Sequence, residues 1–239
     1  MLSALSQDNV FYRENFSQCI TKDVKHQNWY LKPTFGNWNH FGSCLAKGIR
    51  RVLETPEKKD KCLELFGNPS KSFMWMLTTS KFYNILFDIA KLRNKWEGHG
   101  PRVSPKKYEE RLKLINSYLI KLINLVNDNF KDVYLVSPLK SIYKDGVYHY
   151  QVENLMTSRA PFKSINIKTL EPMDAETKYV IHKDQMVPVP LLPLFDVIES
   201  PEKEQEACYY YNGIDSKEKI AQFISYHFSK EADVHATSK

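Results

Sequence analysis

Residues 93–99 (RNKWEGH) bring a guanidinium, a carboxamide and an imidazole close together along the chain, on Arg93, Asn94 and His99. An arginine fork holds phosphate oxygens through paired hydrogen bonds, and a histidine exchanges protons near neutral pH. The amide of Asn94 both donates and accepts hydrogen bonds, so it can orient either partner. These residue types at this spacing indicate a site that handles a phosphate group.

A long helix has to position these residues. The pattern predicts one helix over residues 72–96, which ends where Gly98, Gly100 and Pro101 follow. When this helix is turned 100° per residue, Arg93 falls opposite the polar stripe, among Phe82, Leu86 and Ile89. A charge on an apolar face is costly unless it is paired or faces a cleft. Arg93 therefore either faces a cleft or snorkels and caps the last carbonyls of the helix, and the spacing favours neither.

The following helix is predicted from Ser104 as N-cap and Pro105 as first helical residue. Apolar residues recur along it at steps of four and three, and Ile123 widens the stripe: Tyr108, Leu112, Ile115, Leu119, Leu122 and Val126. Such a stripe fits a dimer seam or the core face of a monomeric bundle. Only three heptads are present, which favours the core face.

The periodicity of the chain changes near Lys131. Helices are predicted over 38–54 and 56–66, whereas short strands are predicted over 133–136, 148–152, 164–167 and 179–182. Residues 186–198 carry three prolines and are expected to form an edge or an extended crossing segment, because proline cannot donate to a sheet ladder. Residues 208–211 and 222–227 are expected to form a final pair of strands. The expected fold class is α+β, with an α-helical bundle over 1–131 and a smaller, mainly β region over 132–239.

Composition sets the outer limits on function. The 239 residues carry a net charge of +6, which mildly favours an acidic partner such as nucleic acid. Neither a GxGxxG nor a GxxxxGK[ST] loop occurs, and the four cysteines have no CxxC spacing, so no cofactor and no metal is expected. No signal peptide and no membrane span is expected, and a reducing cytoplasm is the expected location.

Arg93 followed by Asn94 and then by His99, at the end of a helix in an α-helical region, resembles the R-x(4–6)-H motif of the HEPN superfamily. The likeness covers roughly residues 35–130 by helix layout. The segments Leu191–Leu194 and Ile224–His227 also look like a β-rich extension that accompanies some bacterial HEPN proteins. The N-terminal region is thus expected to be a HEPN-like bundle.

The resemblance implies RNA cleavage without a metal, through the 2′-hydroxyl, leaving a 2′,3′-cyclic phosphate and a 5′-hydroxyl. It implies that Arg93, Asn94 and His99 are catalytic, that two copies face each other in a homodimer through the helical domain, and that the setting is a toxin or phage defence. A regulatory protein partner is a further expectation. Weaker RNA-binding candidates are the basic residues Lys95, Arg102, Lys106, Lys107, Arg50 and Arg51, which a solvated surface explains equally.

Two other classes of function remain open on the sequence. The chain could be a catalytically inactive HEPN-like module that binds RNA, a nucleotide or a protein. It could also be a structural interaction protein in which Arg93 and His99 are packing residues. The two tryptophans of this region, Trp75 and Trp96, could stack on bases, although tryptophan on an apolar helix face belongs more often to the core.

Overall fold

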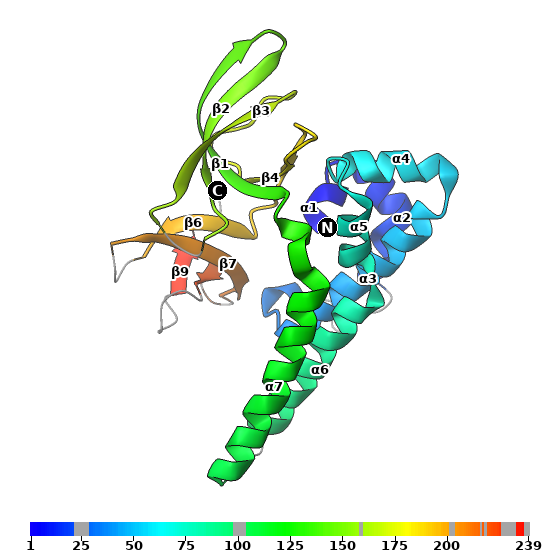
Figure 1. Cartoon of the computed structure of the whole chain (residues 1–239), viewed down its shortest axis with the longest axis vertical. Helices are drawn as coiled ribbons and strands as arrows, with labels where there is room; N and C mark the ends of the chain where they lie inside the picture. Colours follow the sequence, from blue (N-terminus) through cyan, green and yellow to red (C-terminus); the bar gives the residue numbers. More distant parts are fainter. Residues whose placement is uncertain are drawn as a thin grey trace.

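The computed structural model describes residues 1–21, 29–97, 104–157, 160–200, 204–215, 217, 219–225 and 233–236. Helices fill the N-terminal part and antiparallel strands the C-terminal part, as the change of periodicity predicted (Figure 1). The helical elements are α1 (Leu2–Leu5), α2 (Asn9–Thr21), η1 (Trp29–Leu31), α3 (Phe35–Leu53), α4 (Pro56–Leu65), α5 (Lys71–Thr78), α6 (Ser80–Glu97), α7 (Pro105–Val126) and η2 (Asn127–Phe130). The α+β class is therefore confirmed.

Local signals set most helix ends. The hydroxyl of Thr34 accepts a hydrogen bond from the Asn37 backbone N–H, and the Asn37 side chain accepts one from the Thr34 N–H, which together start α3. Pro56 occupies the first turn of α4, as expected. Gly67 follows α4 with φ +72°, and a Cβ there would lie 2.9 Å from Cγ2 of Val189, so both the backbone and the packing favour glycine.

The single helix predicted over 72–96 is wrong, because Thr79 separates α5 from α6. Thr79 is extended, with φ −66° and ψ 134°. The Thr78 hydroxyl donates to the carbonyl of Met74 at 2.7 Å, and an Arg50 Nη1 donates to the carbonyl of Thr78. These bonds satisfy carbonyls at the helix end, and Thr-Thr-Ser has low helix propensity. The break lets α5 bury its apolar face while α6 leaves in a new direction.

The strands form two antiparallel sheets. The first has the order β3-β2-β1-β4-β5 and the second the order β6-β7-β8-β9. Their bounds are β1 (Val133–Lys144), β2 (Val147–Asn154), β3 (Lys163–Thr169), β4 (Tyr179–His182), β5 (Pro188–Pro190), β6 (Phe195–Glu199), β7 (Glu206–Ile214), β8 (Ala221–Ile224) and β9 (Asp233–Ala236). Each sheet has an edge strand drawn from residues 186–199, which confirms the edge placement predicted from the prolines.

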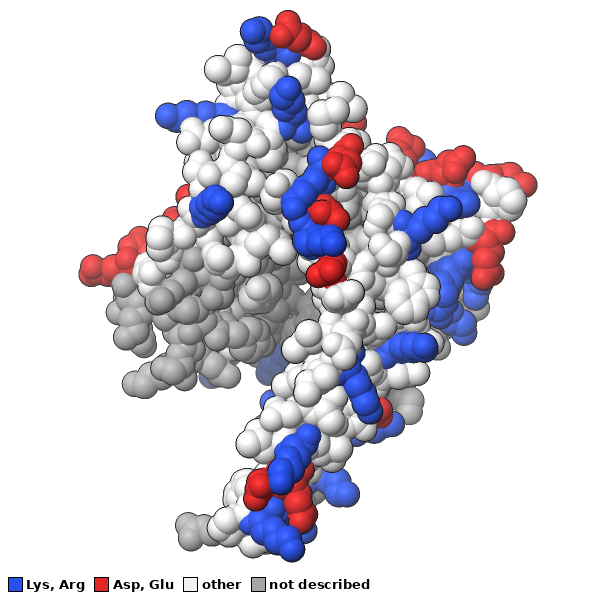
Figure 2. Space-filling view, viewed as in Figure 1, with Lys and Arg blue, Asp and Glu red and all other residues white. Residues whose placement is uncertain are grey.

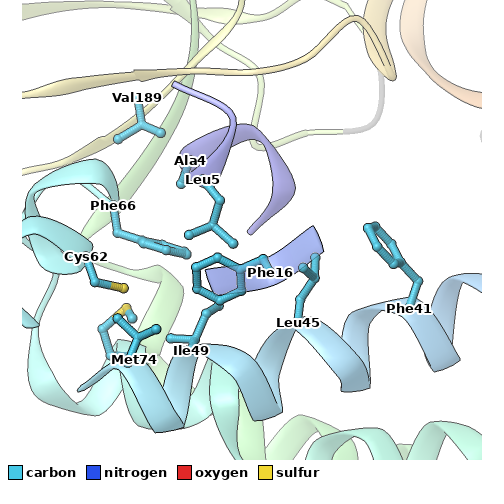
Figure 3. Close-up of a cluster of buried hydrophobic side chains, with 11 residues drawn as sticks. Ala4, Leu5, Phe16, Phe41, Leu45, Ile49, Cys62, Phe66, Met74 and Val189 are labelled. Carbon is cyan, nitrogen blue, oxygen red and sulfur yellow. The ribbon is translucent and has the colours of Figure 1, made fainter. Parts of the chain in front are cut away.

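One apolar core joins the helices to the first sheet. Phe16 of α2 and Ile49 of α3 are fully buried, and Val189 of β5 belongs to the same cluster (Figure 3). The backbone N–H of Leu192 also donates to the hydroxyl of Ser3 at 3.2 Å. The secondary structure thus changes near residue 131, but the packing continues across that point.

Candidate functional site

The helices α6 and α7 pack side by side and form a hairpin, which we call the arm, whose far end projects away from the remaining elements (Figure 1). The amide of Asn39 in α3 donates to the carbonyl of Tyr83 at 3.2 Å, so α3 lies beside the first part of α6. Arg93 is ten residues further along α6, about 15 Å at the rise of an α-helix. The N-terminal end of α3 is Phe35, only four residues before Asn39. This end of α3 therefore lies well short of Arg93.

Arg93, Asn94 and Lys95 occupy the last turns of α6, and all three side chains are exposed. The helical wheel places Arg93 on the apolar face of α6. The helix α3 does not cover that face at the position of Arg93, so the charge of Arg93 does not have to be buried. Lys95 lies in the last turn, where the helix dipole favours a cation. The free end of the arm therefore presents a cation and an amide of the 93–99 motif to solvent.

The start of α7 lies at the same end of the arm. The hydroxyl of Ser104 accepts a hydrogen bond from the Lys107 backbone N–H at 3.4 Å, and Pro105 follows, as predicted. Lys106 and Lys107 are exposed there. Charged side chains gather toward this free end in the view of Figure 2. The arm thus brings Arg93, Lys95, Lys106 and Lys107 to one end, although residues 98–103 separate the two pairs in sequence.

A cation–π contact ties the two helices together near the free end. The Arg111 guanidinium lies 5.4 Å from the centre of the Trp96 ring, which is half-buried. Trp96 therefore supports the arm from a half-buried position, outside the buried core clusters of the described residues. Trp75, by contrast, is 52% exposed, so the expectation of a core position is wrong for that residue. Residue 75 lies on the outer side of the short α5, whose inner face buries Phe73 and Met76.

Two of the predicted site residues, His99 and Arg102, lie outside the described residues. Two others, Arg50 and Arg51, are described but lie elsewhere. Arg50 is half-buried and satisfies the last carbonyl of α5, and Arg51 lines a hollow of about 310 Å³ with residues of α2, α3 and α4. The helix α6 starts at Ser80, just after the break at Thr79, and Arg93 lies 13 residues further along it, about 20 Å away. Arg50, which bonds to Thr78, therefore does not share the site at the free end.

Two hollows were not predicted from the sequence. One, of about 710 Å³, lies on the first sheet and is lined by residues that include Tyr134, Tyr150 and Lys183. The other, of about 400 Å³, lies where helices meet both sheets and is lined by Phe73, His182 and other mostly apolar residues. Alternation along a strand identifies residues that share a face, but the curvature that hollows a sheet depends on features such as the irregularity between Pro138 and Lys140 in β1.

His182 is a buried histidine of β4. Burial lowers the pKa of its imidazole, and a hydrogen bond with the backbone of Phe66 opposes that shift. Its ring lies 4.8 Å from the ring of Phe73. This histidine is therefore neutral near pH 7 and packs in the core, which makes it a structural residue. Over the described ranges, no group of three or more histidine, cysteine or acidic side chains is placed to hold a metal ion.

Comparison of the chain with protein-family models, with curated proteins and with solved structures gave no match. None of the helices in the described part of the chain is both long and apolar enough to cross a membrane. The arm and the 93–99 motif are therefore the features of this chain that indicate a function.

Proposed function

We propose that this chain is a metal-independent endoribonuclease of the HEPN type. It cleaves RNA through the 2′-hydroxyl beside the scissile phosphate and leaves a 2′,3′-cyclic phosphate and a 5′-hydroxyl. The observation that carries the proposal is the exposure of Arg93 and Asn94 at the free end of the arm, with His99 six residues after Arg93. A polyanion can approach such a site without any rearrangement of the core.

In this proposal each residue of the motif has a separate task. His99 exchanges protons with the attacking 2′-hydroxyl or the leaving 5′-oxygen, since its imidazole titrates near neutral pH. Arg93 holds non-bridging phosphate oxygens and stabilises the charge that develops on them. Asn94 orients the phosphate or the imidazole by hydrogen bonds. Lys95, Lys106 and Lys107 attract the RNA backbone to the same end of the arm.

The proposal extends to the setting that the family likeness implies. Two copies associate through a HEPN-like helical domain, so that two motifs share one cleft. The enzyme acts in the cytoplasm as a toxin or in phage defence, and a further protein regulates it. The free end of the arm has a small basic excess, with Arg93, Lys95, Lys106 and Lys107 against Glu97, Glu109 and Glu110, which supports an acidic substrate such as RNA.

The test is cleavage of mixed cellular RNA by the full chain in the presence of EDTA, with analysis of the new ends. We expect cleavage to persist in EDTA and the products to carry 2′,3′-cyclic phosphates and 5′-hydroxyls. Replacing a general acid or base typically slows a reaction by about 10²–10⁴-fold, so His99→Ala should lose detectable cleavage. Arg93→Ala should do the same, and Asn94→Ala should have a milder effect.

Matched variants away from the arm separate catalysis from folding. Arg13→Ala replaces an exposed arginine of α2, and His149→Ala replaces a histidine of β2; both should cleave as wild type does. Circular dichroism should show that Arg93→Ala and His99→Ala remain folded. Products with 5′-phosphates, or equal cleavage by wild type and His99→Ala, would refute the proposed chemistry.

A binding module without catalysis is the second candidate, and one surface favours it. Strand β1 of the β1–β2 hairpin exposes three large apolar side chains, with Leu139 49%, Ile142 71% and Tyr143 63% exposed. Ile142 and Tyr143 are neighbours in the strand and point to opposite faces, so either face of the hairpin could contact another protein. Tight binding of RNA without cleavage would favour this candidate. Binding of a protein partner through Ile142, together with no binding of RNA, would also favour it.

A further inference from the structure

The outer face of α7 is apolar and uncovered. Over its 22 residues α7 has no buried residue at all. Four large side chains along one side of it are exposed: Tyr108 and Leu112 are 59% exposed, Leu119 is 42% and Ile123 is 66%. Ile120, which borders them, is 57% exposed. The sequence favoured a core position for the apolar face of α7. Ile115, Leu122 and Val126 are half-buried, but Tyr108, Leu112, Leu119 and Ile123 are exposed, so only part of that face is covered.

The exposed residues form one continuous strip, which we call the α7 stripe: Tyr108, Leu112, Asn116, Leu119 and Ile123. The spacings are 4, 4, 3 and 4, so the five positions fall within about 80° of one another on a helix of 3.6 residues per turn. The contact with α6 uses a different side of α7, where Arg111 meets Trp96 and where Tyr118 and Leu125 border a groove beside Ile85. The stripe is thus a second face, and α6 does not use it.

We infer that a second copy of this chain covers the α7 stripe, with the two α7 helices parallel and in register. The exposed parts of the four apolar residues of the stripe and of Ile120, which borders it, amount to roughly 600 Å² on each copy, judged from typical side-chain areas. Two such faces bury roughly 1,200 Å², the lower limit of specific interfaces. The area on each copy is at the upper end of the apolar patches that soluble monomers typically leave exposed, about 300–600 Å².

The side chains of the α7 stripe are suited to pack against the same side chains of a second copy. None of the five residues is charged, and a two-fold axis between parallel helices sets each residue opposite its counterpart. Asn116 lies at the middle of the strip, where its amide can both donate to and accept from the other Asn116. A single asparagine in an apolar seam fixes the register of paired helices. On the flank, Glu109 and Lys113 neutralise each other at 2.7 Å within one helix.

The parallel direction rests on the proposed function, because that function needs two motifs in one cleft. Parallel arms bring both free ends together, whereas antiparallel arms separate them. Asn116 is 12 residues from Ser104, so antiparallel free ends would lie roughly 36 Å apart. Asp128, at the other end of α7, already pairs with Lys131 at 3.6 Å, which weakens any attraction of that end for Lys106 and Lys107. RNA should strengthen the parallel dimer, because it offsets repulsion between the basic ends.

Cysteine cross-linking tests the direction of the helices. Tyr108→Cys and Ile123→Cys are each oxidised with copper–phenanthroline in air, and the products are separated on a non-reducing gel. Parallel pairing predicts a disulfide-linked dimer from each variant alone. Antiparallel pairing predicts a link only when the two variants are mixed, and that result would overturn the inference. Wild type and Leu114→Cys, whose residue lies roughly opposite the stripe on α7, should give no dimer.

Light scattering at tens of micromolar tests whether the stripe is the contact. Wild type should be dimeric, and Leu112→Lys or Ile123→Lys should weaken the dimer at least about tenfold, because each buries a charge in the seam. Leu114→Lys adds the same charge to another side of α7 and should leave the dimer intact. A monomeric wild type, or a dimer that Ile123→Lys does not weaken, would overturn the inference. A monomer that still cleaves RNA would refute the shared cleft but leave the chemistry proposed for Arg93 and His99 standing. A parallel dimer that never cleaves RNA would refute the ribonuclease proposal alone.

Discussion

The core around α3 and the arm made by α6 and α7 are built from similar helices but use their apolar faces differently. Phe16 and Ile49 are 0% exposed and Leu45 is 2% exposed, because α2, α4 and β5 close around α3 (Figure 3). In the arm, α7 has no buried residue and leaves Ile123 66% exposed. Periodicity of 3.6 residues therefore identifies an apolar face, but it does not identify what covers that face.

The comparison predicts very different costs for removing an apolar side chain in the two regions. Phe16→Ala should lower the free energy of unfolding by about 3–5 kcal/mol, because it removes a fully buried ring and leaves a cavity. Leu112→Ala in the arm should cost less than about 0.5 kcal/mol when the protein is diluted to monomer, as for most surface changes. Urea denaturation followed by circular dichroism measures both. Similar losses of unfolding free energy in the two variants would contradict the expected difference between the core and the arm.

Tyr83 lies where the arm leaves the core and should show an intermediate effect. Its hydroxyl donates to the carbonyl of Leu77 at 2.8 Å, across the break between α5 and α6, and burial raises its pKa well above the usual range. Tyr83→Phe should therefore lower the free energy of unfolding by about 0.5–1.5 kcal/mol, the usual net worth of one hydrogen bond. Tyr143→Phe, at a position that is 63% exposed, is the control and should be neutral. An equal loss for both variants would mean that this bond does not stabilise the root of the arm.

The smallest expected effect is a dependence of core stability on pH. Burial lowers the pKa of His182, so the folded chain binds a proton there less readily than the unfolded chain does. The contribution of neutral His182 to the free energy of unfolding is fully present above the ordinary pKa of histidine. It is lost as the pH falls below that value toward the lowered pKa of the folded state. The free energy of unfolding should fall more steeply between pH 7 and pH 5 in wild type than in His182→Gln. Parallel slopes in urea titrations would contradict this role of His182.

Local signals in the sequence were sufficient for much of the fold. The switch from helices to strands near Lys131, the start of α7 at Ser104 and Pro105, and the edge position of β5 with its two prolines all follow from backbone chemistry of a few neighbouring residues. The break at Thr79 was missed because neither glycine nor proline marks it. It depends on Thr78 and on Arg50, which reaches the carbonyl of Thr78 from 28 residues earlier in the chain.

For the candidate site, the sequence by itself supplied the chemistry of Arg93, Asn94 and His99 and the apolar periodicity of α7. Only the tertiary structure decided that Arg93 is exposed, that Arg50 serves the end of α5, and that the α7 stripe is uncovered. The physical reason is that hydrogen bonds at helix ends and side-chain types act over a few residues, and can be recognised along the chain. Burial depends on which distant segments arrive at a surface, and α3 ends before it reaches the free end of the arm.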